Sequence, residues 1–306
     1  MEKEVKKEAY LGRGIHNKKF AESLIKGKLK QMLIAISNDN DLDVQIRKNY
    51  LNIYYQGGNI ARVKSENSIE FDEFYFYLDM KTIPKKDLPQ DKIKALKTQR
   101  KSLVSKFKVG NYKDYFENAK VIMDKWFEKK EKPERLEQHK LSIENQYNKS
   151  DYTIIDLEFE VSIKSDYVCN HIPDNKVKAK KPRFDIIAIN KQGKLCVIEL
   201  KKGLGAIHNT SGLQEHWDCY QQSIGRNHEP FMREMTFLLK QKQDFNLIDK
   251  RVVINNPDPE FMFAYSYAKS PSQKVQDYTF QTECSKVNPN IPILTLALGS
   301  YKLMDK

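Results

Sequence analysis

Two acidic residues and one lysine in the middle of the chain have the types and spacing that phosphodiester chemistry uses. Asp185 lies in the run RFDIIAIN, and Glu199 and Lys201 lie in the run VIELKKG that follows it. Two carboxylates in one pocket can bind Mg²⁺ or Mn²⁺ and leave coordination positions for water and phosphate. A neighbouring lysine can orient or deprotonate the attacking water and stabilise charge on phosphorus. Asp185, Glu199 and Lys201 are therefore candidate catalytic residues, with Asp185 and Glu199 as the metal ligands.

The strands that carry these residues determine where their side chains point. RFDIIAIN and KLCVIELKK both read as β-strands, and a short loop containing Gly193 joins them. Glu199 and Lys201 are two residues apart, so they point from the same face of their strand. Paired strands lie only about 4.8 Å apart, so Asp185 can share a pocket with them. The alternative is an exposed charge pattern on an ordinary sheet, but the apolar residues around Glu199 do not suit a solvated edge.

The pattern of an Asp on one strand, a Glu-x-Lys 14 residues later on the next strand, and then a helix resembles the PD-(D/E)XK nuclease superfamily. The order from the helix at Pro133 to the helix containing Gln214 resembles its helix-strand-strand-strand-helix core. The family's Pro-Asp pair is interrupted, because the sequence reads Pro182-Arg183-Phe184-Asp185. The resemblance implies an α/β fold with a restriction-endonuclease-like core, in which helices flank a mixed central sheet. It also implies a Mg²⁺-dependent nuclease that hydrolyses phosphodiester bonds of DNA.

The resemblance further implies supporting residues on neighbouring elements. Many members place a Glu on the first core helix, where Glu137 is the candidate and a solvated helical glutamate is the alternative. Glu158, on the first core strand, is a candidate further ligand or a partner of one. Gln214 is a candidate for contact with phosphate or with a metal-bound water, and Lys202 for electrostatic assistance. For His216, on the same helix as Gln214, a core or surface position stays open.

Positive charge is concentrated in two segments of the chain. The net charge is +12 and the isoelectric point is near 9.2. Residues 81–110 contain ten Lys or Arg against two Asp, and residues 176–183 contain five Lys or Arg and no acid. Basic surfaces bind polyanions through counterion release, so we expect nucleic acid as a partner, with a solvated lysine-rich surface as the alternative. The candidate contacts to nucleic acid are Lys92, Lys94, Lys97, Arg100, Lys180, Lys181, Arg183 and Lys202.

Pro84 and Pro89 punctuate the chain and predict two units, residues 1–88 and residues 89–306. The first unit predicts a small α+β module, in which Tyr- and Ile-rich runs flank a Gly-Gly-Asn turn and pair as antiparallel strands. The second unit predicts the nuclease-like α/β domain. Other predicted elements are a helix over residues 16–37, a third alternating strand over residues 69–79, and strands at residues 251–255, 260–267 and 292–301.

Several function classes find no support in the composition. No apolar run approaches the roughly 20 residues that a membrane helix needs, so we expect no membrane partner. The N-terminus is charged and lacks an apolar signal region, and the four cysteines form no CxxC pair. These features predict a cytoplasmic protein without a structural zinc site. Two other functions stay open: a non-catalytic nucleic-acid-binding protein that retains the nuclease fold, and a defence-complex component that acts only with a partner.

Overall fold

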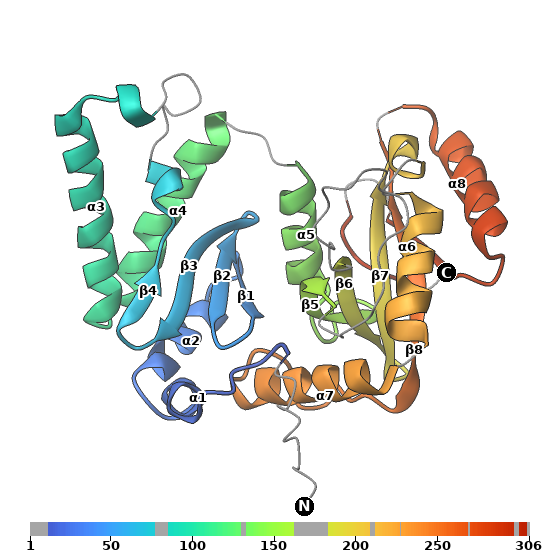
Figure 1. Cartoon of the computed structure of the whole chain (residues 1–306), viewed down its shortest axis with the longest axis horizontal. Coiled ribbons are helices and arrows are strands. Elements are labelled where there is room, and N and C mark those ends of the chain that lie inside the picture. The colour runs from blue at the N-terminus through green and yellow to red at the C-terminus, as the bar shows by residue number, and fades with distance from the viewer. Residues whose placement is uncertain are drawn as a thin grey trace, which may run out of the picture.

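Two β-sheets, each with its own helices, make up the structure (Figure 1). The first sheet has strand order β1-β2-β3-β4 and is antiparallel, and the second has order β5-β6-β7-β8-β9 and is mixed. The predicted α/β class with a mixed sheet is thereby confirmed. The computed structural model describes residues 12–76, 85–129, 133–161, 183–208, 212–226, 228–268, 270–296 and 300–304.

The first sheet is built around the predicted hairpin. Its elements are α1 (Lys18–Ile25), α2 (Leu29–Ser37), β1 (Leu42–Ile46), β2 (Leu51–Tyr55), β3 (Gly58–Ser65) and β4 (Ser68–Glu70). Gln56 and Gly57 form the turn between β2 and β3, and both have positive φ, 47° and 78°. Two-residue turns with this backbone conformation match the twist of paired strands. The turn therefore lies slightly before the Gly57-Gly58-Asn59 position expected from the sequence.

Two predicted elements of this region are wrong in detail. The helix expected over residues 16–37 is interrupted near Gly27, where a Cβ would lie 2.7 Å from the Cα of Ser23. The strand expected over residues 69–79 ends at Glu70, and Glu73–Phe76 form the 3₁₀ helix η1. Asp72 accounts for this change, because its side chain accepts a hydrogen bond from the amide of Phe74 at 2.9 Å and so favours a turn.

The basic helices of the middle region pack against the first sheet. They are α3 (Gln90–Lys108) and α4 (Tyr112–Lys129), and the short 3₁₀ helix η3 (Lys85–Asp87) precedes them. The hydroxyl of Tyr115 on α4 donates to the carbonyl of Ile60 on β3 at 2.6 Å, and the guanidinium of Arg100 donates to the carbonyl of Phe71 at 2.6 Å. By packing, α3 and α4 thus belong with the first sheet (Figure 1), while the division at residue 88 stays a prediction.

The second sheet follows α5 in the chain. The elements of this region are α5 (Pro133–Glu144), β5 (Tyr152–Glu160), β6 (Arg183–Asn190), β7 (Lys194–Lys202), η4 (Leu204–Ala206), α6 (Leu213–Tyr220), the π-helical turn η5 (Gln221–Gly225), α7 (His228–Asp244), β8 (Asn256–Ser266), α8 (Gln273–Val287) and β9 (Ile293–Leu296). β5, β6 and β7 are antiparallel, and β8 and β9 continue the sheet parallel to β7. The strand predicted at residues 251–255 is wrong, because pairing with β7 begins only at Asn256.

Apolar side chains bury both faces of the second sheet. Ile186, Ile198 and Met262 lie on the face that packs with Leu141 of α5. The opposite face belongs to the main core, which also contains buried residues of α6, α7 and α8. A sheet covered on both faces explains why its strands read as nearly continuous apolar runs. None of the helices in the described part of the chain is both long and apolar enough to cross a membrane.

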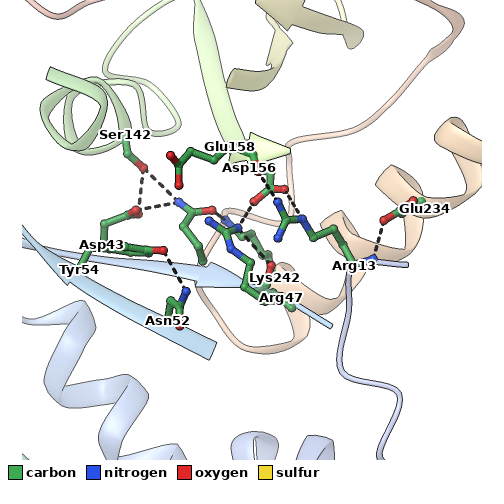
Figure 2. A network of polar contacts seen from close by, with 12 residues as sticks. Arg13, Asp43, Arg47, Asn52, Tyr54, Ser142, Asp156, Glu158, Glu234 and Lys242 are labelled. Carbon is green, nitrogen blue, oxygen red and sulfur yellow. Dashed lines mark hydrogen bonds and ion pairs between the residues drawn. The ribbon is translucent and has the colours of Figure 1, made fainter. Parts of the chain in front are cut away.

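A buried network of charges joins the two sheets (Figure 2). Asp156 of β5 is fully buried and forms ion pairs with Arg13 at 2.9 Å and with Arg47, next to β1, at 2.7 Å. On α7, the ammonium of Lys242 donates to the side-chain oxygen of Gln45 on β1 at 3.2 Å, and burial lowers the pKa of this lysine. Charges buried this deeply need paired partners, and these contacts connect β5 and α7 with β1 and its neighbouring residues.

Candidate active site

Asp185 and Glu199 lie opposite each other where β6 and β7 separate. Ile186 and Ile198 form the last pair of the β6–β7 ladder, so Asp185 and Glu199 are the next residues on each strand. There the backbone amide of Leu200 donates a hydrogen bond to Oδ2 of Asp185 at 3.0 Å, so a side chain takes the place of a backbone acceptor. This bond holds the carboxyl of Asp185 in the space between the strands, beside Glu199.

Glu199 and Lys201 share one face of β7. Leu195 and Val197, which precede them at the same spacing, belong to the main core, and Leu200 packs on the opposite face. Glu199 is 1% exposed and Lys201 is 5% exposed, so both charged groups are inside the protein. The alternation of strand side chains thus has the register expected from the sequence. A carboxyl and an ammonium this deeply buried need charged or polar partners.

The electrostatics of the pair come mainly from burial. Desolvation raises the pKa of Asp185 well above its ordinary value, and the neighbouring carboxyl of Glu199 raises it further. Desolvation also raises the pKa of Glu199 to about 7, while the positive charge of Lys201 and the hydrogen bond with Asp185 oppose this rise. Two buried carboxyl groups this close favour a shared proton or a bound cation.

One further observation supports binding of a divalent cation by Asp185 and Glu199. Oε1 of Glu199 is buried and has no hydrogen-bond donor as a partner. An anionic oxygen without a donor is what a hard cation takes as a ligand, and such cations complete their coordination with water or phosphate oxygens. Within the described ranges, no group of three or more His, Cys, Asp or Glu side chains is arranged to hold a metal ion. Asp185 and Glu199 would therefore be the protein's two contributions.

Helix α6 brings a histidine, rather than the predicted glutamine, to this pair. Nδ1 of His216 lies 3.1 Å from Oε2 of Glu199. Gln214 is exposed, and its amide donates to the side chain of Asp218 at 2.9 Å, so it contacts neither carboxyl. Residues two apart on a helix point in different directions, which separates the two side chains. The two residues lie on one short helix, so their spacing alone does not indicate which of them reaches the pair.

Helix α5 contributes two neighbouring residues on the other face of the sheet. Glu137 forms an ion pair with Lys202, which points away from Glu199. The second carboxylate oxygen of Glu137, Oε2, is buried without a hydrogen-bond partner. Gln138 was missed by the sequence reasoning. Its side-chain amide lies 3.4 Å from Oδ1 of Asp185, at the limit of a hydrogen bond. Only its position next to Glu137 could have drawn attention to it.

Glu158 is level with Asp185 in the sheet but has a different environment. The pairs Leu157–Ile186 and Phe159–Phe184 place Glu158 beside Asp185 on the neighbouring strand. Its φ is +49°, which is unusual within a strand, and its carboxylate lies 3.6 Å from the guanidinium of Arg183. Glu158 also lines a cavity between the two sheets, whereas Arg183 does not.

The predicted nucleic-acid contacts are divided among several places. Lys92, Lys94 and Lys97 are exposed on α3, which lies at the outer edge of the first region, far from β6 and β7 (Figure 1). Arg100, on the same helix, is turned inward toward Phe71. Lys180 and Lys181 fall outside the described residues. Of the eight candidates, Arg183 and Lys202 are on the strands that carry the carboxyl pair.

Comparisons with known proteins found no match to this chain. No family model matches the chain, and no curated protein or solved structure matches it. The geometry of the carboxyl pair is therefore the only support for a function.

Proposed function

We propose that this chain is a metal-dependent nuclease that hydrolyses phosphodiester bonds of nucleic acid, with DNA as its substrate. The observation that carries the proposal is the buried pair of Asp185 and Glu199, with Lys201 on the same face of the strand. Perturbed carboxyl groups beside a buried lysine are frequent in sites that do chemistry. The order α5, β5, β6, β7, α6 and then a strand parallel to β7 supports a restriction-endonuclease-like core.

Asp185 and Glu199 would hold Mg²⁺ or Mn²⁺ in this proposal. When bound, such an ion supplies positive charge to phosphate oxygens and acidifies water. The two carboxyl groups would then remain anionic at neutral pH, although burial alone favours their protonated forms. The amide of Leu200 and the side chain of His216 orient the two carboxyl groups, since each contacts one of their oxygens.

Lys201 acts on the substrate rather than on the fold. Its side chain points from the same face of β7 as that of Glu199, and its positive charge lowers the pKa of both Asp185 and Glu199. From there it can orient the attacking water and stabilise the negative charge that develops on the phosphate oxygens as the P–O bond breaks. Lys202 and Glu137 lie on the other face of the sheet, where their ion pair positions α5 against β7.

The test compares conservative variants of two carboxyl groups, one buried and one partly exposed, in a cleavage assay with labelled DNA. Glu199→Gln keeps the size of the side chain but removes the anionic ligand, so Mg²⁺-dependent cleavage should be lost. Glu260→Gln is the matched control, because Glu260 lies on β8 and pairs with Lys194 at 2.8 Å, near the start of β7. Cleavage by Glu199→Gln at the wild-type rate would reject the proposal. DNA binding by the wild type without any cleavage in Mg²⁺ or Mn²⁺ would favour a non-catalytic binding protein instead.

A further inference from the structure

A polar cavity of about 480 Å³ lies between the first sheet and the α5–β5 region. Its wall is formed by β1, β2, β3, β4 and η1 of the first region together with α3, α5 and β5, which follow later in the sequence. Figure 1 shows α5 beside the first sheet. The volume is within the range of sites that hold small molecules. Neither the carboxyl pair nor the proposed cleavage accounts for so large a polar space.

The wall has hydrogen-bonding capacity that the protein does not use. Asn52, Asn59, Arg62 and His139 each have a buried polar side-chain atom without a hydrogen-bond partner. Asn52 and His139 are each 6% exposed, so water outside the protein does not satisfy them. Buried polar atoms usually have partners, so four residues with an unpaired atom around one cavity form a wall suited to a polar ligand.

Charges of both signs line the cavity. Three guanidinium groups come from three elements, Arg62 of β3, Arg100 of α3 and Arg135 of α5, and Arg47, which also pairs with Asp156, follows β1. Guanidinium groups bind phosphate oxygens with two parallel hydrogen bonds. Carboxylates are present as well, Asp43, Glu70, Asp72, Glu73 and Glu158, so a simple anion would meet repulsion. The ligand must therefore combine an anionic group with N–H donors.

Two tyrosine rings complete the wall. Tyr54 and Tyr75 line the cavity together with the two asparagines. A planar heterocycle can stack on such rings, and its amino and ring N–H groups can donate to asparagine and carboxylate oxygens. A nucleotide has all three parts that the wall requires: a phosphate, a planar ring and N–H donors. We propose that this cavity is a binding site for one nucleotide, separate from the Asp185–Glu199 pair.

The nucleotide has two sources with the same chemistry, a free nucleoside monophosphate or the end of a nucleic-acid strand. Gln138 lines the cavity and also lies 3.4 Å from Asp185, and Glu158 lines it beside Asp185 in the sheet. A strand whose terminal nucleotide is held here would have its next linkages close to the carboxyl pair. The strand-end source rests on the proposed nuclease function, whereas nucleotide binding itself does not.

The experiment measures binding to the full chain in EDTA, where cleavage does not occur. The probes are the four nucleoside monophosphates, by calorimetry, and an oligonucleotide with and without a 5′-phosphate, by fluorescence anisotropy, with inorganic phosphate for comparison. Arg62→Gln and Arg135→Gln should each weaken nucleotide binding about tenfold or more, since each removes charge-assisted hydrogen bonds. Arg233→Gln is the matched control, because Arg233 pairs with Glu229 on α7 as Arg62 pairs with Glu70. Thermal unfolding checks that the variants are folded.

Each outcome decides the proposal. Binding of monophosphates that the two cavity variants weaken supports it with the free nucleotide as source. Weakened binding of the oligonucleotide alone supports it with the strand end as source. It is overturned if no probe binds, if the control variant weakens binding equally, or if inorganic phosphate binds as tightly as the nucleotides. Loss of cleavage in Glu199→Gln with nucleotide binding unchanged separates the two proposals, because cleavage and nucleotide binding then fail independently.

Discussion

The substitution Glu199→Gln should stabilise the cation-free protein at pH 8. The folded protein raises the pKa of Glu199 from its ordinary value of 4.5 to about 7, mainly through burial. A difference of about 2.5 in pKa, at about 1.4 kcal/mol for each pH unit, corresponds to about 3.5 kcal/mol at high pH and to about 3 kcal/mol at pH 8. This is the cost of keeping Glu199 ionised in the fold without a cation, and the neutral glutamine does not incur it. Charged groups that an active site requires often lower the stability of the folded protein.

The pH dependence has a definite sign. Because the folded-state pKa is the higher one, the contribution of Glu199 to stability is fully present below pH 4.5 and is lost as the pH rises through about 7. The difference between variant and wild type should therefore be near zero at pH 4.5 and reach about 3 kcal/mol at pH 8. Asp185, Lys201 and His216 also face this carboxyl, so the comparison is made between the two proteins at each pH.

The assay is urea unfolding in EDTA at several pH values, followed by the same series in Mg²⁺. Mg²⁺ should stabilise the wild type at pH 8 by binding the folded state only, and should leave Glu199→Gln unchanged. Glu260→Gln provides the reference for an isosteric change at a paired carboxylate. Equal stability of wild type and Glu199→Gln in EDTA at pH 8 would refute the reasoning, because the carboxyl pair would then have no excess negative charge to relieve.

Three further predictions follow from the geometry. Asp156→Ala should destabilise the protein by about 3–5 kcal/mol in urea unfolding, because it leaves two buried guanidinium groups without their counter-charge; Glu229→Gln, which breaks an exposed pair, should change stability by less than about 0.5 kcal/mol. Calorimetric titration should show that Mn²⁺ binds to the wild type and to Lys201→Ala but not to Asp185→Asn. Equal Mn²⁺ affinities of all three proteins would mean that Asp185 is not a metal ligand. Replacing Lys92, Lys94 and Lys97 by Gln should flatten the salt dependence of DNA affinity; an unchanged slope would mean that α3 does not contact DNA.

The sequence was informative where structure depends on local patterns. The alternation of apolar residues in RFDIIAIN and KLCVIELKK is enough to predict β6 and β7 and the common face of Glu199 and Lys201, because side chains alternate along any strand. The hairpin at Gln56 and Gly57 was predictable for a similar reason, since turn residues act over a few positions.

Contacts between distant segments could not be predicted in this way. Gln138 reaches Asp185 only because α5 packs against the second sheet, and His216 reaches Glu199 only because α6 covers the other face. The nucleotide cavity and the network around Asp156 need the first sheet and β5 to meet, across about 100 residues of chain. The periodicity of apolar residues does not indicate which distant segments of the chain pack together. Packing of α3 and α4 on the first sheet escaped prediction for the same reason.

The most direct test of the proposed catalytic unit compares two adjacent lysines in single-turnover cleavage of labelled DNA. Lys201 is buried on the same face of β7 as Glu199, whereas Lys202 points to the other face and pairs with Glu137. The wild type should cleave in Mg²⁺ and not in EDTA. Lys201→Ala should lower the rate by about 10²-fold or more while DNA binding remains, and Lys202→Ala should retain the rate within a few-fold. Absence of cleavage by the wild type, or equal damage from the two substitutions, would contradict the account.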